Sequence, residues 1–414
     1  MTKTIKLALV AAMAMGATSA FATNGDNLIG LGAKSRAMGG TGIAHFNGAE
    51  TATSNPALIT KSKGTNFAFG GTYFSPAVEI ETNTNGVAAA TGAGATYESD
   101  AKHNVIPYVA LTENLGNGFA VGVSMFGSAG MGVDYRSTGG GTANGAEVFG
   151  MRSNLLLLKF SIPVAYGQDN WSVGIAPVLM YGSLDMSLNF PTANPPAMTF
   201  KDVGNGSSSS FGTGLELGAA YTLPDLGLTI GATYHSAIKM EYKDQISSIS
   251  QEFSYPVGQF SDKLDQPAEY GLGIDWTEGD LSLTMDWKNI RWENARGYQD
   301  FGWRNQDVYA LGAEYRMDDL SLRAGFNYAE NPIEETPASD GGRLNLLNMG
   351  MFPAVTQRHY TIGAGYQFTK HVAVDLAATY GVSGDITSDT GANAGIVKVT
   401  NDQMAFSANL NYSF

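Results

Sequence analysis

The chain has 414 residues, no cysteine, and 38 acidic against 24 basic residues, which gives a formal net charge of −14 at pH 7. The lack of cysteine excludes disulfides and thiol chemistry, and the acidic balance argues against a nucleic acid as partner. The hydrophobic fraction of 43% is ordinary, and no stretch after the amino terminus approaches the roughly 20 consecutive apolar residues of a membrane helix.

The first residues have the three parts of a secretory signal peptide. Lys3 and Lys6 precede an apolar run over residues 7–15, and Ala20-Phe21-Ala22 forms an A-x-A cleavage site. The run is too short to cross a bilayer as a helix. We therefore expect residues 1–22 to be a signal peptide rather than an ordinary core helix.

Residues 23–62 lack the alternation of apolar and polar residues that begins further along the chain. Glycines interrupt the segment throughout, and Ser54-Asn55-Pro56-Ala57 is a turn signal. The segment is too long for a frayed terminus, so we expect it to be a separate folded unit.

From Phe67 onward, apolar residues alternate with small or polar ones in fourteen segments, and helical periodicity is not evident. One apolar and one polar face suit a wall between lipid and water. The segments cover residues 67–73, 105–111, 119–125, 156–166, 171–181, 211–223, 226–234, 268–276, 281–287, 309–317, 320–328, 360–368, 372–380 and 404–414. Six short turns alternate with seven longer links, near residues 75–103, 127–150, 190–206, 243–264, 293–304, 331–356 and 385–401.

The last segment has the clearest pattern, because even positions from Met404 to Phe414 are almost all apolar and odd positions are small or polar. We interpret it as the closing strand of an outer-membrane barrel. Its terminal Phe414 resembles the signal that the barrel-insertion machinery reads, so we expect this machinery to be a partner during assembly.

Charged residues inside the apolar segments support the same interpretation. All of them fall on the face opposite the apolar one, and a lysine or arginine that faces lipid at the bilayer midplane costs about 2–4 kcal/mol. They are Lys159, Glu216, Glu269, Asp275, Asp286, Glu314, Arg316, Arg323 and Asp375. The alternative is a soluble β-sandwich, in which the same alternation would serve two packed sheets.

The sequence therefore predicts an all-β protein, a 14-stranded antiparallel transmembrane β-barrel over residues 63–414, with residues 23–62 as a plug in the lumen. The 52 glycines fit strands whose side chains must clear a filled lumen. We expect a monomer in the Gram-negative outer membrane, surrounded by outer-membrane lipids and lipopolysaccharide, with no cofactor and no metal.

Two motifs carry a resemblance to a known family. Residues 32–42, followed by Asn55, Pro56 and Ala57, resemble the amino-terminal hatch of the FadL/TodX-type transporters of long-chain fatty acids and hydrocarbons. The resemblance continues at residues 307–315, 322–326 and 359–366. It implies a hatch-plugged barrel of fourteen strands and uptake by diffusion without ATP, and it places the Asn55-Pro56-Ala57 triplet in the gating hatch.

The resemblance also implies a route for the ligand. An apolar groove between the third and fourth extracellular loops captures it, an interior pocket beside the hatch receives it, and a lateral opening in the wall releases it. The two links hold apolar residues that suit such a groove, namely Phe190, Met198, Phe200, Phe253, Tyr255 and Phe260. The alternative is that these two loops pack on each other.

A ligand with a carboxylate needs a basic group in the interior, because an unpaired buried charge is costly. Lys159, Arg316 and Arg323 are the candidates. The alternative is that they brace the lumen by pairing with acids on neighbouring strands, such as Glu216, Glu269, Glu314 or Asp375.

Passive uptake of a long-chain fatty acid or a similar hydrophobic molecule is the function that these features favour. Two alternatives remain from other classes: a porin for small solutes, and an outer-membrane enzyme that acts on lipids. The five histidines show neither metal-ligand spacing nor a recognisable Ser-His-acid pattern. We therefore expect a protein that is not an enzyme.

Overall fold

The structure, a computed structural model, describes residues 24–83, 95–139, 149–192, 199–334, 343–384, 386–389 and 396–414. The predicted signal peptide at residues 1–22 lies outside the described residues, as does Met198.

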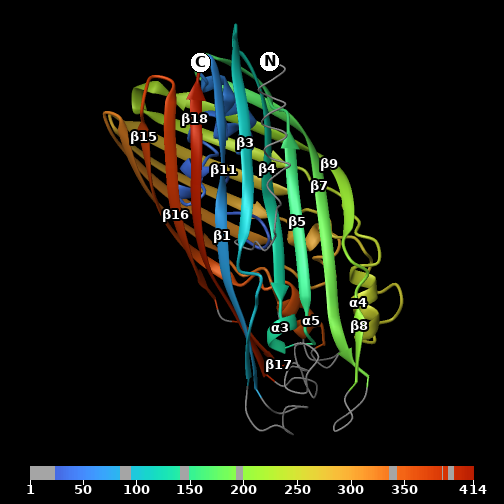
Figure 1. The fold of residues 1–414 in the computed structure, drawn as a ribbon. Coiled ribbons are helices and arrows are strands. Elements are labelled where there is room, and N and C mark those ends of the chain that lie inside the picture. The colour runs from blue at the N-terminus through green and yellow to red at the C-terminus, as the bar shows by residue number, and fades with distance from the viewer. Residues whose placement is uncertain are drawn as a thin grey trace.

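Fourteen antiparallel strands form a closed wall around a lumen (Figure 1). They are β1 (Thr65–Asn83), β3 (Asn104–Gly116), β4 (Phe119–Asp134), the interrupted strand made of β5 (Arg152–Ser161) and β6 (Val164–Gln168), β7 (Trp171–Pro191), β9 (Ser208–Leu223), β10 (Leu228–His235), β11 (Glu269–Glu278), β12 (Leu281–Ile290), β13 (Gln306–Met317), β14 (Leu320–Ala329), β15 (Thr356–Gln367), β16 (Val372–Ser383) and β18 (Ile396–Ser413). The wall closes because β1 pairs with β18 over the whole of its length, from Asn66↔Ser413 to Asn83↔Ile396. The predicted 14-stranded barrel is confirmed.

Several strands run far beyond the predicted boundaries, so the starts of the first two long links and the end of the last were wrong. The third link begins where it was predicted, because β7 ends at Pro191. β1 continues to Asn83 and β18 begins at Ile396, and the two stay paired throughout. Beyond the membrane the polarity of the faces inverts: Val78 and Ile80 are buried toward the interior, whereas Glu81 faces outward and is exposed. The ladder continues because its hydrogen bonds do not depend on lipid, but the outer face now meets water.

The long loops contain further short elements that the sequence did not indicate. Three strands extend the sheet: β2 (Ala95–Glu98), β8 (Phe200–Val203) and β17 (Ile386–Asp389). The helices are α3 (Arg136–Gly139), α4 (Ile246–Glu252) and α5 (Arg343–Met351), and one 3-10 turn is η6 (Trp292–Asn294). A second 3-10 turn, η5 (Pro224–Leu226), lies in the short turn between β9 and β10. These helices are short, and the sequence beyond Phe67 shows no helical periodicity that would have indicated them. Within the described ranges, none of the helices has the length and apolar character to cross a membrane.

The loop elements gather at one end of the barrel, opposite the end where the carboxy terminus lies (Figure 1). There a large cluster of buried apolar side chains, here called the loop core, fills the interior. It includes Met131, Leu155, Met180, Ile249, Phe253, Tyr255, Phe260, Trp292, Phe301, Trp303, Leu347 and Phe352. The long loops mark this end as extracellular and the short turns mark the other as periplasmic.

Residues 24–62, here called the hatch, lie inside the barrel in the half nearer the carboxy terminus (Figure 1). The hatch contains the short helix α2 (Ala33–Ala37) and the 3-10 turns η1 (Gly48–Thr53) and η2 (Pro56–Lys61). Its fit depends on wall glycines. A Cβ added to Gly174 would lie 2.5 Å from the carbonyl carbon of Pro56, and one added to Gly231 would lie 2.1 Å from the carbonyl oxygen of Ile43. Much of the high glycine content therefore makes room for the hatch.

Candidate functional site between the hatch and the wall

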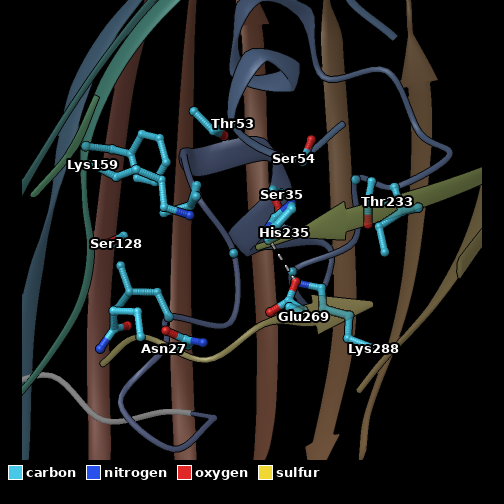
Figure 2. Close-up of a pocket in the computed structure, with 18 of the residues that line it drawn as sticks. Asn27, Ser35, Thr53, Ser54, Ser128, Lys159, Thr233, His235, Glu269 and Lys288 are labelled. Carbon is cyan, nitrogen blue, oxygen red and sulfur yellow. Dashed lines mark ion pairs between the residues drawn. The ribbon is translucent and has the colours of Figure 1, made fainter. Parts of the chain in front are cut away.

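A central cavity of about 90 Å³ lies between the hatch and the wall. Figure 2 shows Asn27 and Ser35 of the hatch at this cavity, together with wall residues that carry charge. Its basic and acidic lining residues are Lys159, His235, Glu269, Asp286 and Lys288. The cavity is therefore polar as well as apolar, since Leu28, Leu31, Ile43 and Phe126 also line it.

Each basic side chain at the central cavity has an acidic partner. The Nζ of Lys159 lies 3.0 Å from Oε1 of Glu216. Oε1 of Glu269 lies 3.8 Å from Nδ1 of His235, the pair drawn as a dashed line in Figure 2, and 3.9 Å from Nζ of Lys288. Because the two lysines and the histidine are paired with acids of the wall, a neutral ligand would meet no unpaired basic group at this cavity.

The three predicted lumen cations occupy different places. Arg323 is buried and lies 2.6 Å from both Glu314 and Asp375, so two carboxylates saturate its guanidinium. Arg316 is 46% exposed at the periplasmic rim, 3.6 Å from Glu314. Lys159 alone of the three lines the central cavity. All three cations therefore pair with acids of the wall, which is the alternative stated in the sequence analysis. A carboxylate-binding role remains a prediction, and of the three only Lys159 lies at the central cavity, where it could have that role.

The Asn55-Pro56-Ala57 triplet fastens the hatch to the wall. Asn55 Nδ2 donates to the carbonyls of Ile43 at 2.7 Å and of Ala219 at 3.3 Å, while its Oδ1 accepts from the Ala57 N–H at 3.0 Å. Pro56 starts η2 at its first position, where its missing N–H costs no hydrogen bond. All three residues are buried. Their position explains how they hold the hatch; their part in gating stays a prediction.

Two buried hatch carboxylates provide further anchors. Glu50 accepts from Asn409 of β18 at 2.7 Å and from the N–H of Lys34 at 3.1 Å. Burial outweighs the nearby Lys34 charge and raises the pKa of Glu50 to about 7. Asp26 accepts from Tyr298, in the loop after β12, and burial raises its pKa to about 6. The hatch is thus tied to the wall at one point and to an extracellular loop at the other.

The wall changes its pairing where the hatch begins. Among the described residues, the ladder between β3 and β4 ends at the pair Tyr108↔Phe126, although β4 continues to Asp134. The β4–β5 register also shifts between Gly127 and Ala129, which is a bulge. The segment at residues 127–133 is here called the β4 edge.

The hatch occupies the β4 edge in place of β3. Leu28 donates its N–H to the carbonyl of Ser128 at 3.3 Å, and Gly130 donates to the carbonyl of Asp26 at 3.0 Å. The sequence analysis did not find this feature. The residue that could have indicated it is Pro107, because a proline has no N–H to donate within the ladder of β3.

Two of the predicted capture residues meet in the loop core. Phe190, the last residue but one of β7, and Phe253, which follows α4, have ring centroids 5.9 Å apart. Phe149, which the sequence analysis missed, stacks on Phe190 at 5.5 Å and meets Phe253 edge-on at 5.4 Å. These rings come from three different loops. Their apolar character was visible in the sequence, but their contacts with one another were not.

The other predicted capture residues lie elsewhere. Tyr255 and Phe260 pack together at 4.9 Å, and Phe260 stacks on Phe301 at 5.6 Å. Phe200 begins β8 and is half-buried, and Met198 lies outside the described residues. The fourth loop therefore packs inward against the third and fifth loops, as the packing alternative describes, and ligand capture remains a prediction.

Comparison with known proteins gives concordant matches over the whole chain. The family model described as outer membrane protein transport protein (OMPP1/FadL/TodX) matches residues 7–414. The long-chain fatty acid transport protein of Escherichia coli O6:H1 is 24% identical over 468 aligned positions, with 99% of this chain and 98% of that protein covered. Outer membrane protein P1 of Haemophilus influenzae is 23% identical, with 93% of each covered.

Two solved structures share the fold. The Pseudomonas putida toluene transporter TodX is 20% identical and superposes with a TM-score of 0.69, covering 94% of this chain and 99% of its own. A Pseudomonas aeruginosa FadL homologue is 16% identical and superposes with a TM-score of 0.71, covering 94% of this chain and all of its own. At these identities the likeness concerns the fold.

Proposed function

The chain belongs to the family of outer membrane protein transport proteins (OMPP1/FadL/TodX), and on that premise we propose that it takes up long-chain fatty acids or similar hydrophobic molecules by diffusion. The relatives named above are a fatty acid transport protein and a toluene transporter. The observation that carries the proposal is a hatch that fills the periplasmic half of the lumen and contacts the wall where the ladder between β3 and β4 ends.

The first step of the route is capture at the extracellular end. The loop core offers aromatic and methionine side chains beneath the loops, and such groups adapt their packing to apolar ligands. Phe253, at its centre, is 5% exposed, so only a local movement of the fourth loop is needed to expose apolar surface. A ligand that displaces these contacts exchanges one apolar environment for another.

The second step is passage from the central cavity to the bilayer. A polar channel along the axis would need the hatch to leave, and hatch contacts with the wall are numerous and buried. The β4 edge offers a shorter path, because the hatch residues Asp26 and Leu28 stand where β3 would otherwise pair. In the proposed mechanism these contacts break, the hatch terminus withdraws, and the ligand leaves sideways into the lipid.

The test locks the hatch to the β4 edge. Asn27 and Ala129 form an antiparallel bridge, and directly opposed residues of this kind have the spacing that a disulfide requires. Since the chain has no cysteine, the double variant Asn27→Cys/Ala129→Cys contains only the designed pair. We expect the oxidised form to lose uptake of labelled oleate and toluene in cells, and a reductant to restore it.

Each single variant serves as the matched control and should transport in both redox states. Undiminished uptake through a fully cross-linked protein would refute lateral release at the β4 edge. Large, steady ohmic currents from the uncross-linked protein in planar bilayers would instead favour a porin.

A further inference from the structure

Arg36 is a buried basic residue of the hatch that has no acidic partner in the described part of the chain. It lies in α2 and is 2% exposed, its Nη2 has no hydrogen-bond partner, and none of the ion pairs among the described residues includes it. By contrast, Lys34 in the same helix lies 3.7 Å from Asp375. Burial alone shifts the pKa of Arg36 downward, to about 10, so the side chain stays charged at neutral pH.

A buried guanidinium without an acid is costly, because its desolvation is not offset by an opposite charge. Folded proteins keep such a group where it serves a partner that is present only part of the time. The chemistry that matches it is an anion, and a carboxylate matches the planar fork of a guanidinium best.

Arg36 lines a small cavity between the hatch and the wall, here called the Arg36 cavity. A second donor lies there: Tyr108 of β3 is buried, and its hydroxyl has no partner. The remaining lining includes Leu28 and Leu31 of the hatch and Ile106 and Phe126 of the wall. The cavity thus offers two buried donors without partners, the guanidinium of Arg36 and the hydroxyl of Tyr108. Thr72 and Asn409 add polar surface, and Oδ1 of Asn409 also lacks a partner. The remaining lining is apolar.

The Arg36 cavity adjoins both the central cavity and the β4 edge. It shares Leu28, Leu31 and Phe126 with the central cavity, and Gly127 belongs to the β4 edge. Its volume of about 10 Å³ holds about one water molecule. A larger group therefore enters only when the hatch separates from the wall, which is the movement that lateral release requires.

We propose that Arg36, with the hydroxyl of Tyr108, binds the carboxylate head group of a fatty acid as the ligand passes between the hatch and the β4 edge. This inference rests on the proposed uptake function and names the ligand class within it, an anionic amphiphile rather than a neutral hydrocarbon. The guanidinium compensates the head group where it would otherwise enter the wall unpaired, and the apolar lining receives the chain.

The test compares two ligands that have the same hydrocarbon chain but different head groups, a carboxylate and its uncharged methyl ester. Purified protein in detergent is titrated with radiolabelled oleate and with methyl oleate. Replacing a charge-assisted pair by an apolar side chain removes about 1.5–3 kcal/mol, so Arg36→Met should weaken oleate binding about ten- to hundredfold. It should leave methyl oleate binding unchanged, and Arg36→Lys should retain part of the oleate affinity.

Two further variants separate binding from folding. Arg304→Met, the same replacement at an exposed arginine of an extracellular loop, should not change the binding of either ligand, and Tyr108→Phe should weaken oleate binding by a smaller factor than Arg36→Met. The melting temperature of Arg36→Met should be unchanged or raised, because an uncompensated buried charge is removed.

Equal losses for oleate and methyl oleate, together with a lowered melting temperature, would make Arg36 a packing residue and overturn the proposal. Wild-type protein that binds methyl oleate but not oleate would overturn it while leaving uptake of neutral hydrophobic molecules intact. Wild-type protein that binds neither ligand would refute the proposed function and the carboxylate site together.

Discussion

The two halves of the lumen are filled by different means. In the extracellular half, the loop core packs aromatic, methionine and aliphatic side chains that come from several loops. In the periplasmic half, the hatch meets the wall through named hydrogen bonds, such as that of His45 with Asp275 at 2.7 Å, and through close backbone contacts at glycines. The first filling is non-directional, whereas the second depends on exact partners.

This difference separates two tasks within one barrel. Apolar contacts are individually weak and tolerate repacking, so the loop core can open locally and close around different ligands. The hatch interface has few intermediate states, because moving a hatch residue breaks its hydrogen bonds to the wall completely. The extracellular half is therefore suited to admit a ligand and the periplasmic half to retain or release it.

The largest effect is expected from emptying the centre of the loop core. Phe253→Ala removes a ring that contacts Phe149 and Phe190, and a buried Phe→Ala change costs about 3–5 kcal/mol. We expect faster amide hydrogen exchange in α4 and the fourth loop, with protection in the hatch unchanged.

Val257→Ala in the same loop is the control, since Val257 is 86% exposed. If exchange in the hatch rose as much as exchange in the fourth loop, the two halves would form one cooperative unit and the comparison would fail.

A smaller effect is expected from overfilling the hatch interface. In Gly174→Ala the new Cβ would lie 2.5 Å from the Pro56 backbone, and overpacking of this kind costs about 1–3 kcal/mol. The hatch should dock less tightly, which we expect to appear as lower hydrogen-exchange protection in η2 and as higher conductance in planar bilayers.

The matched control is Val173→Ile, which adds a methyl group to the adjacent lipid-facing position of β7. Its side chain is exposed on the outside of the barrel, so hatch protection should not change. Equal effects of the two variants would show that the wall, rather than the hatch seat, responds to added volume.

The membrane-spanning parts of the fold were predictable, because the bilayer forces each residue to face either lipid or lumen. Lipid-facing Leu272 and Ile274 are exposed on the barrel surface, whereas Asp275 and Asp286 point inward, as the alternation predicts. The same pattern fails beyond the bilayer, where Val78 and Ile80 face inward. Strand ends could not be located there because no apolar solvent marks the outer face.

The site was less predictable, because it depends on contacts between distant residues. Arg316 and Arg323 both lie opposite the apolar face of their strands, yet one reaches the rim and the other bridges two acids. Arg36 lay within the recognised hatch motif, but only the packing reveals that it lacks an acidic partner. Aromatic residues in the loops were visible as a group, while their pairing required the fold.

The smallest expected effect is a dependence of hatch docking on pH, and Glu50 sets its sign. Around its carboxylate lie Lys34 on the hatch side and Asp375, Arg323 and Asn409 on the wall side. Docking raises the pKa of Glu50 from its ordinary value of 4.5 to about 7, so the docked hatch binds a proton more tightly than the released hatch.

Docking is then strongest below pH 4.5, weakens as the pH rises through 7, and levels off above that pH. Between pH 6 and 8 the loss amounts to about 1 kcal/mol. Hydrogen-exchange protection factors for the hatch, which correct for the intrinsic effect of pH on exchange, should fall over this range in the wild type. They should fall much less in Glu50→Gln, where Asp26, with its pKa raised to about 6, is the remaining buried carboxyl of the hatch. The loop core lacks such a group at its centre, so the protection of α4 should not follow the same curve. A hatch that became better protected as the pH rose would reverse the assignment, since Glu50 would then be docked as a stable ion rather than as a neutral acid.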